Sequence, residues 1–361
     1  MMRTPARQQE AGIALIIVMI TITFLSILAA VFAFNMKVET KLAQNANSEE
    51  ELTWLGRSGV EAAKWVLAQE MTCPYDALNQ KWAGGSGDIC ETNGPLADVT
   101  LSPFSVNGQT YPFSIKITDL ERKANINIAD QATLEQALRL VGADPGNFTT
   151  IVNSILDWID PDSNTHIDGA ESDYYQGLDP PYLAKNKPLD DLSELLLVKG
   201  VTPEIYWGSA STNHPPAAFQ VRVDRYGRPT GPVSFPVGLA DLFTPISAGR
   251  ININTASAEV LQMIRGVDGN LAEAIVAARG GEDDGSGQTG PFRNLAPQYL
   301  WARVPGLNLE AAREIARVCD VRSRTFEVQV EAEVGGYKRQ FIAIVGRNNP
   351  GDVQTLSFYW K

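Results

Sequence analysis

The sequence predicts an α+β fold: a long N-terminal helix lies on an antiparallel sheet, and a large all-α domain is inserted between the strands of that sheet. Three observations lead to this prediction. An uncharged apolar run near the N-terminus continues into an amphipathic stretch. Strand-like runs occur before residue 120 and again after residue 324. The long middle of the chain is typical of helices joined by glycine-containing turns.

The composition fits an exported protein of two domains. The chain has 361 residues and a formal net charge of −12, which makes it a poor general binder of nucleic acid. Its three cysteines fit an exported protein with one disulfide. Cys73 and Cys90 flank a glycine-rich loop and are the expected pair, which leaves Cys319 as a buried free thiol. Reduced cytosolic thiols are the alternative if the chain is not exported.

The apolar run 13–34 is long enough to cross a bilayer as a helix. It carries no charge over about 22 residues, and a hydrocarbon core is about 30 Å thick. Arg3 and Arg7 precede it, which favours a cytoplasmic N-terminus and an exported remainder. A cleavable secretory signal is one alternative, with residues 31–33 as its cleavage site. A plain uncleaved anchor is another.

The start of the apolar run carries a resemblance to a known family. The polar leader 1–12 ends in Gly12, and the apolar run begins at the next residue, Ile13. This resembles the class III leader of type IV pilins and type II secretion pseudopilins, in which prepilin peptidase cuts after the glycine and the new first residue is N-methylated. The resemblance therefore implies cleavage after Gly12, N-methylation of Ile13, and a transmembrane helix over 13–35 that stays in the inner membrane.

One departure from the pilin pattern is informative. Most pilin-like proteins carry a glutamate at the fifth mature position, where this chain has Ile17. A carboxylate in the apolar layer is costly unless it is paired, and in the family it is thought to meet the N-terminal amine of a neighbouring subunit. A subunit without it suits the tip of a filament. With the length of the chain, this resembles the protein K family of type II secretion; Ile17 as an ordinary lipid-facing residue is the alternative.

Residues 36–120 are expected to form the pilin-like stem helix and the first strands. Apolar residues recur at helical spacing to about residue 70, so this half of the helix should pack on a sheet, with Trp54 and Trp65 in the core. Pro74 should end the helix, and strands are expected at 98–104 and 110–118.

The C-terminal residues 321–361 are expected to supply the closing strands of the same pilin-like domain. Strand-like runs occur at 325–334, 337–345 and 353–359. Gly335 and Gly336 between the first two predict a two-residue hairpin turn.

The expected inserted domain, 121–320, contains an internal repeat. Asn-Ile-Asn-Ile-Ala at 125–129 leads into a helical run and a glycine turn, and Asn-Ile-Asn-Thr-Ala at 252–256 does the same. These asparagines should satisfy backbone groups at helix starts. Helix, glycine turn and helix make the helix-hairpin-helix pattern, and two tandem copies predict a SAM-like α domain. The protein K family carries such an insert between its strands, which supports the resemblance.

The richest candidate site is the acidic segment 157–182. Oxygen ligands at short spacing suit calcium, which takes six to eight oxygens. Five residues occupy the first, third, fifth, ninth and twelfth places of an EF-hand-like loop: Asp160, Asp162, Asn164, Asp168 and Glu171. Thr165 stands where an EF-hand has glycine, and no EF helix follows, so the segment is an acidic loop and not an EF-hand.

The same segment matches the family pattern W-x-D-x-D…G-A-E-x-x-Y-Y at Trp158, Asp160, Asp162, Gly169, Ala170, Glu171, Tyr174 and Tyr175. Members of the family bind calcium in this insert. The resemblance therefore implies calcium as a cofactor, with ligands among Asp157, Asp160, Asp162, Asp168, Glu171 and Asp173. Asp157 could instead cap or pair locally, and His166 is the wrong ligand type for calcium. A polar surface loop with Asx turns is the alternative to any metal site.

Two further segments read as irregular structure. The acidic stretch 282–284 lies in a glycine-rich loop and is interpreted as solvated linker. The Pro- and Gly-rich segment 209–235 is interpreted as a long loop.

Catalysis finds little support in the sequence. The chain has two histidines and lacks a nucleophile elbow, a phosphate loop and a Cys-x-x-Cys motif, so a non-enzymatic protein is expected. The rival class is a membrane-anchored or secreted DNA-binding protein of the competence type. Residues 251–266 resemble the helix-hairpin-helix of such proteins. A working hairpin brings lysine or arginine to the phosphate, whereas Asp268 puts a carboxylate beside this turn, so no nucleic-acid partner is expected.

The resemblance thus implies a minor pseudopilin of the type II secretion system. Such a protein is single-pass in the inner membrane with its bulk in the periplasm, caps the tip of the pseudopilus and helps to initiate its assembly. The implied partners are prepilin peptidase and the other minor pseudopilins, proteins I and J.

Overall fold

The computed structural model describes residues 7–69, 73–88, 90, 91, 94–208, 221–223, 229–232, 237–280 and 289–361. Residues 1–6 of the leader and the acidic stretch 282–284 lie outside the described residues, and so does the loop 209–235 except for 221–223 and 229–232.

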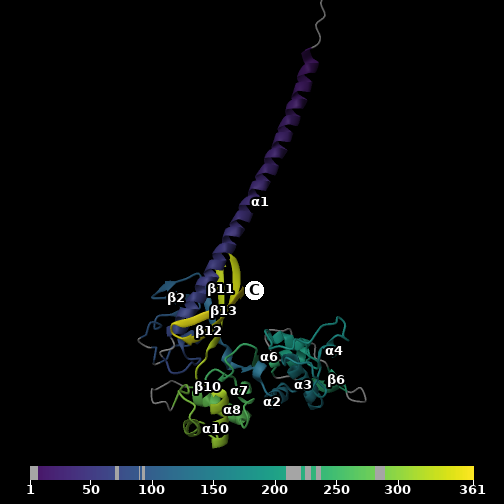
Figure 1. The fold of residues 1–361 in the computed structure, drawn as a ribbon. Coiled ribbons are helices and arrows are strands. Elements are labelled where there is room, and N and C mark those ends of the chain that lie inside the picture. The colour runs from purple at the N-terminus through teal and green to yellow at the C-terminus, as the bar shows by residue number, and fades with distance from the viewer. Residues whose placement is uncertain are drawn as a thin grey trace, which may run out of the picture.

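A 63-residue helix, α1 (Arg7–Gln69), is the axis of the molecule (Figure 1). The junction of Gly12 and Ile13 falls within it, and from Ile13 its apolar half projects alone, with exposed side chains. This half is a candidate membrane span, with a mean hydropathy of 2.8 in its most apolar window. The Thr21 and Thr23 hydroxyls donate to helix carbonyls one turn back, which satisfies them without water.

The second half of α1 packs on a four-stranded antiparallel sheet, and together they form the head. The strands, in spatial order, are β13 (Asp352–Trp360), β12 (Tyr337–Asn349), β11 (Thr325–Val334) and β4 (Phe113–Asp119). Alternate residues of β11 and β12, such as Val330 and Phe341, face the helix and are buried against Val60 and Leu67. Gly56 and Gly59 let the helix approach: an added Cβ would lie 2.5 Å from Phe341 and 2.4 Å from Val330, respectively.

The prediction that Trp54 and Trp65 lie in the core is wrong. Trp54 is 59% exposed and Trp65 is 36% exposed. Each follows a buried residue, Leu52 or Ala63, by two positions, which is about 200° around a helix. Both tryptophans therefore point away from the sheet.

The closing strands lie where the sequence places them, with β12 four residues longer than the apolar run. Gly335 and Gly336 form the turn with φ angles of 58° and 84°. The earlier run 98–104 is broken into shorter pieces. A small separate sheet holds β1 (Thr100–Leu101), β2 (Phe104–Val106) and β3 (Gln109–Thr110). Between α1 and this sheet lies η2 (Lys81–Ala83), and Cys73 and Cys90 on either side of it form a disulfide.

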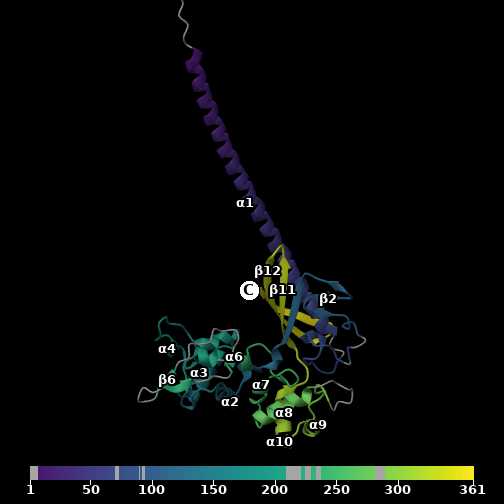
Figure 2. The same cartoon turned by 180° about the vertical axis from the view of Figure 1, so that it is seen from behind.

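The insert between β4 and β11 lies at the end of the head that is farthest from the apolar half of α1 (Figure 2). Its first lobe comprises η3 (Leu120–Arg122), β5 (Ala124–Asn125), η4 (Ile126–Ile128), α2 (Gln131–Val141), η5 (Pro145–Asn147), α3 (Phe148–Ile159), α4 (Ser172–Tyr175), η6 (Leu192–Leu197), α5 (Pro203–Trp207), β6 (Val221–Val223), β7 (Pro229–Pro232), α6 (Leu239–Leu242) and β8 (Phe243–Thr244). Its second lobe comprises β9 (Ile251–Asn252), α7 (Ala258–Leu261), α8 (Gly269–Arg279), α9 (Pro297–Arg303), α10 (Leu309–Val318) and β10 (Cys319–Asp320). One hydrophobic cluster runs through both lobes, and Cys319 is a buried free thiol in it.

The two Asn-Ile-Asn runs build equivalent joints, one in each lobe. Each run opens on a two-residue strand that pairs in parallel, β5 with β8 and β9 with β10. In each run the first asparagine side chain accepts from the N–H of the second at 2.9 Å, which is the local role expected. The second asparagine exchanges two hydrogen bonds with a distant backbone: Asn127 with Leu189, and Asn254 with Phe292. The repeat is therefore structural as well as sequential.

A buried polar network joins the insert to the head. The Asp119 carboxylate, at the end of β4, accepts from Asn252 Nδ2 at 3.2 Å and from Ser323 Oγ at 2.6 Å. Asp76, which follows the stem, accepts from the N–H of Ser323 and pairs with the buried Arg347 guanidinium. These contacts tie the stem exit, the sheet and the second lobe together.

Candidate metal site

The acidic loop (residues 157–173) runs from the last turn of α3 to the start of α4. The buried face of α3 carries Ile151, Ile155 and Trp158 into the hydrophobic cluster, and the same face carries Asp157 inward. Asp160 is the C-cap of α3, and Glu171 precedes the first turn of α4. The two helix ends therefore bring carboxylates that are distant in sequence to one place.

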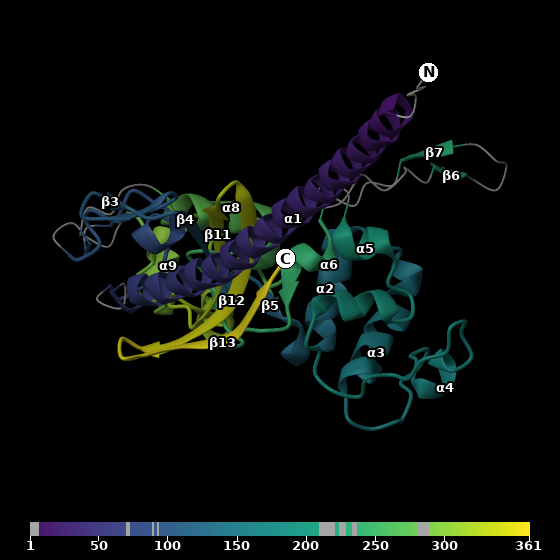
Figure 3. The same cartoon turned by 90° about the horizontal axis from the view of Figure 1, so that it is seen from above.

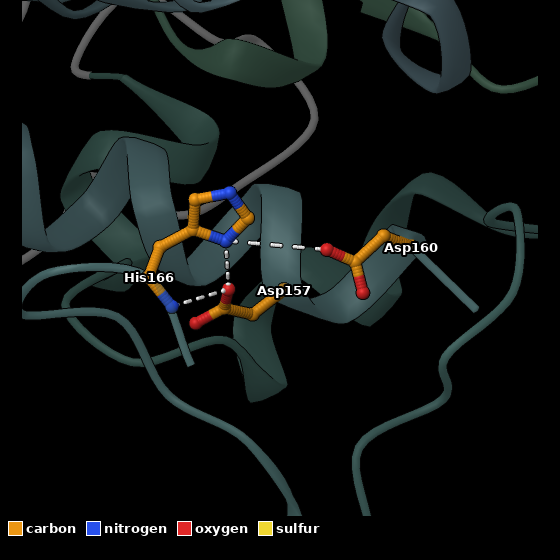
Figure 4. A group of neighbouring side chains, drawn as sticks. All are labelled: Asp157, Asp160 and His166. Atoms are coloured by element: carbon orange, nitrogen blue, oxygen red, sulfur yellow. Dashed lines mark hydrogen bonds and ion pairs between the residues drawn. The ribbon is translucent and has the colours of Figure 1, made fainter. Parts of the chain in front are cut away.

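Asp157 closes the loop. It is fully buried, and its Oδ1 accepts from the backbone N–H of His166 at 3.0 Å and contacts His166 Nδ1 (Figure 4). Its Oδ2 accepts from the N–H of Ala170 at 2.8 Å. A Cβ added to Gly169 would lie 2.1 Å from this Oδ2, so only glycine fits at that position. Both oxygens of Asp157 therefore hold the loop backbone.

Asp160, Asp162 and Glu171 form the second carboxylate group of the loop. Each offers an oxygen, and these oxygens lie within 4.8 Å of one another. Glu171 is only 4% exposed, yet neither of its carboxylate oxygens has a hydrogen-bond partner among the described residues, and Asp160 Oδ1 has none either. Such buried, unpaired acceptors are costly unless a cation or proton satisfies them.

The electrostatics of this group point the same way. Burial raises the pKa of Glu171; the nearby Asn186 side chain opposes this rise in part, and the carboxylates of Asp157 and Asp160 add to it. Burial and the neighbouring Asp162 and Asp157 likewise raise the pKa of Asp160. Crowded carboxylates of this kind favour either a bound proton or a bound cation, and an all-oxygen donor set suits a hard cation such as calcium.

The remaining predicted residues lie elsewhere in the loop. Asp168 and Asp173 are exposed. Neither belongs to the two groups of close ligand atoms found among the described residues, which are Asp157, Asp160 and His166, and Asp160, Asp162 and Glu171. Asp162 Oδ1 accepts from the N–H of Asn164 at 2.7 Å, an Asx turn within the loop. The hydrogen bond to Asp157 raises the pKa of His166, which favours the imidazolium form and not a metal ligand.

One residue of the site was missed by the sequence reasoning. Asn186 lies beyond the acidic segment, and its Nδ2 donates to the Asp162 carbonyl. Its Oδ1 is buried without a partner among the described residues, so it is a further candidate oxygen ligand. A lone asparagine between two lysines carries no recognisable signal, and only the fold brings it to the loop.

Comparison with known proteins finds similar sequences and a similar fold. A family model described as type II secretion system (T2SS), protein K, matches residues 115–208, which include the whole acidic loop. A helix-hairpin-helix motif model matches residues 247–284. The chain is 26% identical to type II secretion system protein K of Aeromonas hydrophila over 211 residues, and 22% identical to that of Pseudomonas aeruginosa over 367 residues.

The chain is thus similar to type II secretion system protein K. The Aeromonas match covers 56% of the chain and 62% of the relative, and the Pseudomonas match covers 97% and 93%. A chain of the GspK–GspI–GspJ complex from enterotoxigenic Escherichia coli has the same fold, with a TM-score of 0.60 at 16% identity, over 88% of this chain and 99% of that one. The predicted fold class, a pilin-like helix and antiparallel sheet with an inserted helical domain, is confirmed.

Proposed function

We propose that the chain is a minor pseudopilin that caps the tip of the type II secretion pseudopilus and helps to start its assembly. The observation that carries this proposal is the shape of the molecule. An exposed apolar half-helix suits insertion beside other such helices in a membrane, and the head and insert stand at its far end (Figures 1 and 2). The bulk of the insert would obstruct a further subunit stacked above it.

The proposed location follows from the N-terminal segment. A single-pass helix with its N-terminus in the cytoplasm leaves the head and insert in the periplasm, on the other side of the inner membrane. The disulfide between Cys73 and Cys90 fits that oxidising compartment. We infer that the role is structural and not catalytic.

The first test is the N-terminal residue of the membrane-extracted protein from cells with and without prepilin peptidase. The proposal requires a peptidase-dependent start at N-methylated Ile13. A peptidase-independent start at Phe34 would identify an ordinary signal peptide, and the tip position would then be abandoned.

The second test concerns partners. The GspK–GspI–GspJ structure is a complex of three such proteins, so we propose proteins I and J of the same system as partners. All three should co-purify from membranes in which they are expressed together. Recovery of I with J, but without this chain, would contradict the proposal.

We further propose that calcium stabilises the insert through the acidic loop. Asp160, Asp162 and Glu171 would hold the ion, with Asn186 as a neutral ligand, while Asp157 positions the loop. Calcium would neutralise the crowded carboxylates and so favour the folded insert. At a free concentration 100 times its dissociation constant, an ion stabilises the fold by about 2.7 kcal/mol.

The calcium proposal is tested by the unfolding temperature of the chelator-treated protein, with and without added calcium. Glu171→Gln should abolish most of the calcium-dependent rise. The matched control is Asp173→Asn, an exposed acid of the same loop outside the ligand group, which should keep it. Equal loss in both variants would mean general charge screening, and no rise in the unaltered protein would refute the site.

DNA binding, the rival function, gains no support from the hairpin. The Asp268 carboxylate at the 266–268 turn accepts from the N–H of Leu271 at 2.8 Å and so caps α8. This puts negative charge at the helix start that would otherwise meet a phosphate.

A further inference from the structure

The last strand, β13, is an edge of the head sheet. Among the described strands it pairs with β12 alone, and it lies at the margin of the head in Figure 3. Residues 353–360 contain no charged residue, proline or glycine, and Leu356, Tyr359 and Trp360 are 61%, 43% and 62% exposed. Soluble proteins normally guard an edge strand with charged residues, proline or a β-bulge, because an open apolar edge pairs with other strands. β13 has one register irregularity, at Leu356, and the Arg339 guanidinium lies 5.7 Å from the Trp360 ring centroid, so residues 357–360 form the regular part of the edge.

The edge presents unpaired main-chain groups as well as apolar side chains. The N–H of Lys361 donates to the carbonyl of Gln340, so alternate residues of β13, Ser357 and Tyr359, bond to β12. By the same alternation, the main-chain groups of Phe358 and Trp360 point away from β12. No described residue bonds to them. A row of main-chain donors and acceptors next to apolar side chains fits an extended backbone better than a helix.

The direction of β13 relative to the stem limits what can pair with it. Arg339, near the start of β12, pairs with Glu49 of α1 at 3.3 Å, and Arg347, near its end, donates to the carbonyl of Leu67 at 3.1 Å. The helix segment from Glu49 to Leu67 and the strand segment from Arg339 to Arg347 are both about 27 Å long. The helix and β12 therefore run in the same direction. β12 and β4 therefore run away from the apolar half of α1, and β13 and β11 run toward it.

Antiparallel pairing with a second copy of this chain does not fit the edge. Antiparallel pairing of β13 with β13 would point the two stems in opposite directions, which one membrane forbids. Pairing with β4 would keep the stems parallel, but β4 is already flanked by η2 and the small β1–β3 sheet. Phe104 of β2 stacks on Phe113 of β4, with ring centroids 5.3 Å apart. Of the two outer strands of the described head sheet, β13 is therefore the free edge.

We infer that β13 is the docking edge for a different pilin-like subunit, whose own edge strand runs away from the membrane and adds antiparallel to β13. This inference rests on the proposed function and deepens it, because it names the surface and the secondary structure of the contact. The sheet would continue from this head into its neighbour while both stems stay parallel. With one edge open and the other covered, the chain can hold one such neighbour and not two, as suits a terminal subunit.

The test uses the full-length protein in membranes that also contain proteins I and J. Benzoylphenylalanine replaces Thr355 on the exposed part of β13 or, as a matched control, the exposed Trp301 of α9 in the second lobe. Irradiation should link position 355, but not 301, to a pilin-like subunit, and the linked peptide should lie on an edge strand of that subunit. No adduct, an adduct to a second copy, or an adduct to a partner helix would each overturn the inference.

A charge-insertion variant gives an independent readout. Leu356→Lys with Trp360→Lys should lower recovery of the partner complex at least tenfold, as loss of a buried aromatic anchor does, while Trp301→Lys leaves it unchanged. The unfolding temperature of the variant is measured first, so that a misfolded head is not scored. If recovery is unchanged in a folded variant, the edge is not the interface. In that case cleavage before Ile13 and co-purification with proteins I and J would still support the proposed function. Only the assignment of β13 as the docking edge would be wrong.

Discussion

The close approach of stem and sheet at Gly59 can be tested with one added methyl group. In an exposed helix, Gly→Ala is stabilising by about 1 kcal/mol because alanine is the better helix former. At Gly59 the new Cβ would lie 2.4 Å from one methyl of Val330 and 2.9 Å from the other. Val330 is fully buried in β11 and its branched side chain is stiff, so it cannot turn aside.

Overpacking of this kind costs about 1–3 kcal/mol, which exceeds the gain in helix propensity. The difference predicts that Gly59→Ala destabilises the head by up to about 2 kcal/mol. The measurement is hydrogen exchange of the β11 and β12 amides in the detergent-extracted full chain, which reports the opening of the head and not of the insert.

Two variants make the result decisive. Ser58→Ala, at the neighbouring exposed position, should change the same exchange by less than about 0.5 kcal/mol. In a Val330→Ala background the space is free, and Gly59→Ala should then become stabilising. If Gly59→Ala alone stabilises the head as it would a free helix, the close approach of stem and sheet is wrong.

Three further outcomes are expected. Asp76→Ala should cost about 3–5 kcal/mol of stability in the same exchange measurement, because it leaves the buried Arg347 unpaired; a cost below 1 kcal/mol would contradict the network. Burial raises the pKa of Asp119 to about 6 and of Glu121 to about 7, so the folded state binds protons more tightly than the unfolded one. The two protonated groups thus stabilise the fold fully below about pH 4, and this stabilisation is lost as the pH rises toward about 7. In a pH series of unfolding temperatures, Glu121→Gln should make the decrease between about pH 4 and pH 7 smaller. Gly169→Ala should remove the calcium-dependent rise in unfolding temperature and cost about 1–3 kcal/mol, since its Cβ would meet a buried carboxylate oxygen; a normal rise would refute that packing.

The sequence patterns were most informative where a local rule fixes the structure. The last three strands follow from alternation and a Gly335–Gly336 turn, and they lie where expected because each pairs with its neighbour in the chain. The repeated Asn-Ile-Asn runs predicted two equivalent joints for a similar reason, since each first asparagine bonds two residues on. Local signals of this kind need no knowledge of the rest of the fold.

The sequence patterns were least informative about which side of the stem helix is buried. Trp54 and Trp65 were expected inside because large aromatics are usually buried, yet the helical angle puts them opposite Leu52 and Ala63. Gly56 and Gly59 allow the sheet to approach the helix, because Phe341 and Val330 lie directly against them. The sequence pattern alone did not indicate this role. Which side of a helix is covered depends on the element that covers it, and that element here lies more than 250 residues away in sequence.

The acidic loop shows the same limit at the level of chemistry. Six carboxylates at short spacing predicted a cation loop, but spacing alone could not divide them by role. The fold does so through hydrogen bonds: the oxygens of Asp157 accept from the loop backbone, while those of Glu171 are buried and have no hydrogen-bond partner in the described part of the chain. An acceptor that is satisfied by the chain positions the loop, and one that is buried but unsatisfied needs a ligand. By that criterion Asn186, with a buried carbonyl oxygen and no charge, belongs with Glu171, and Asp173 does not.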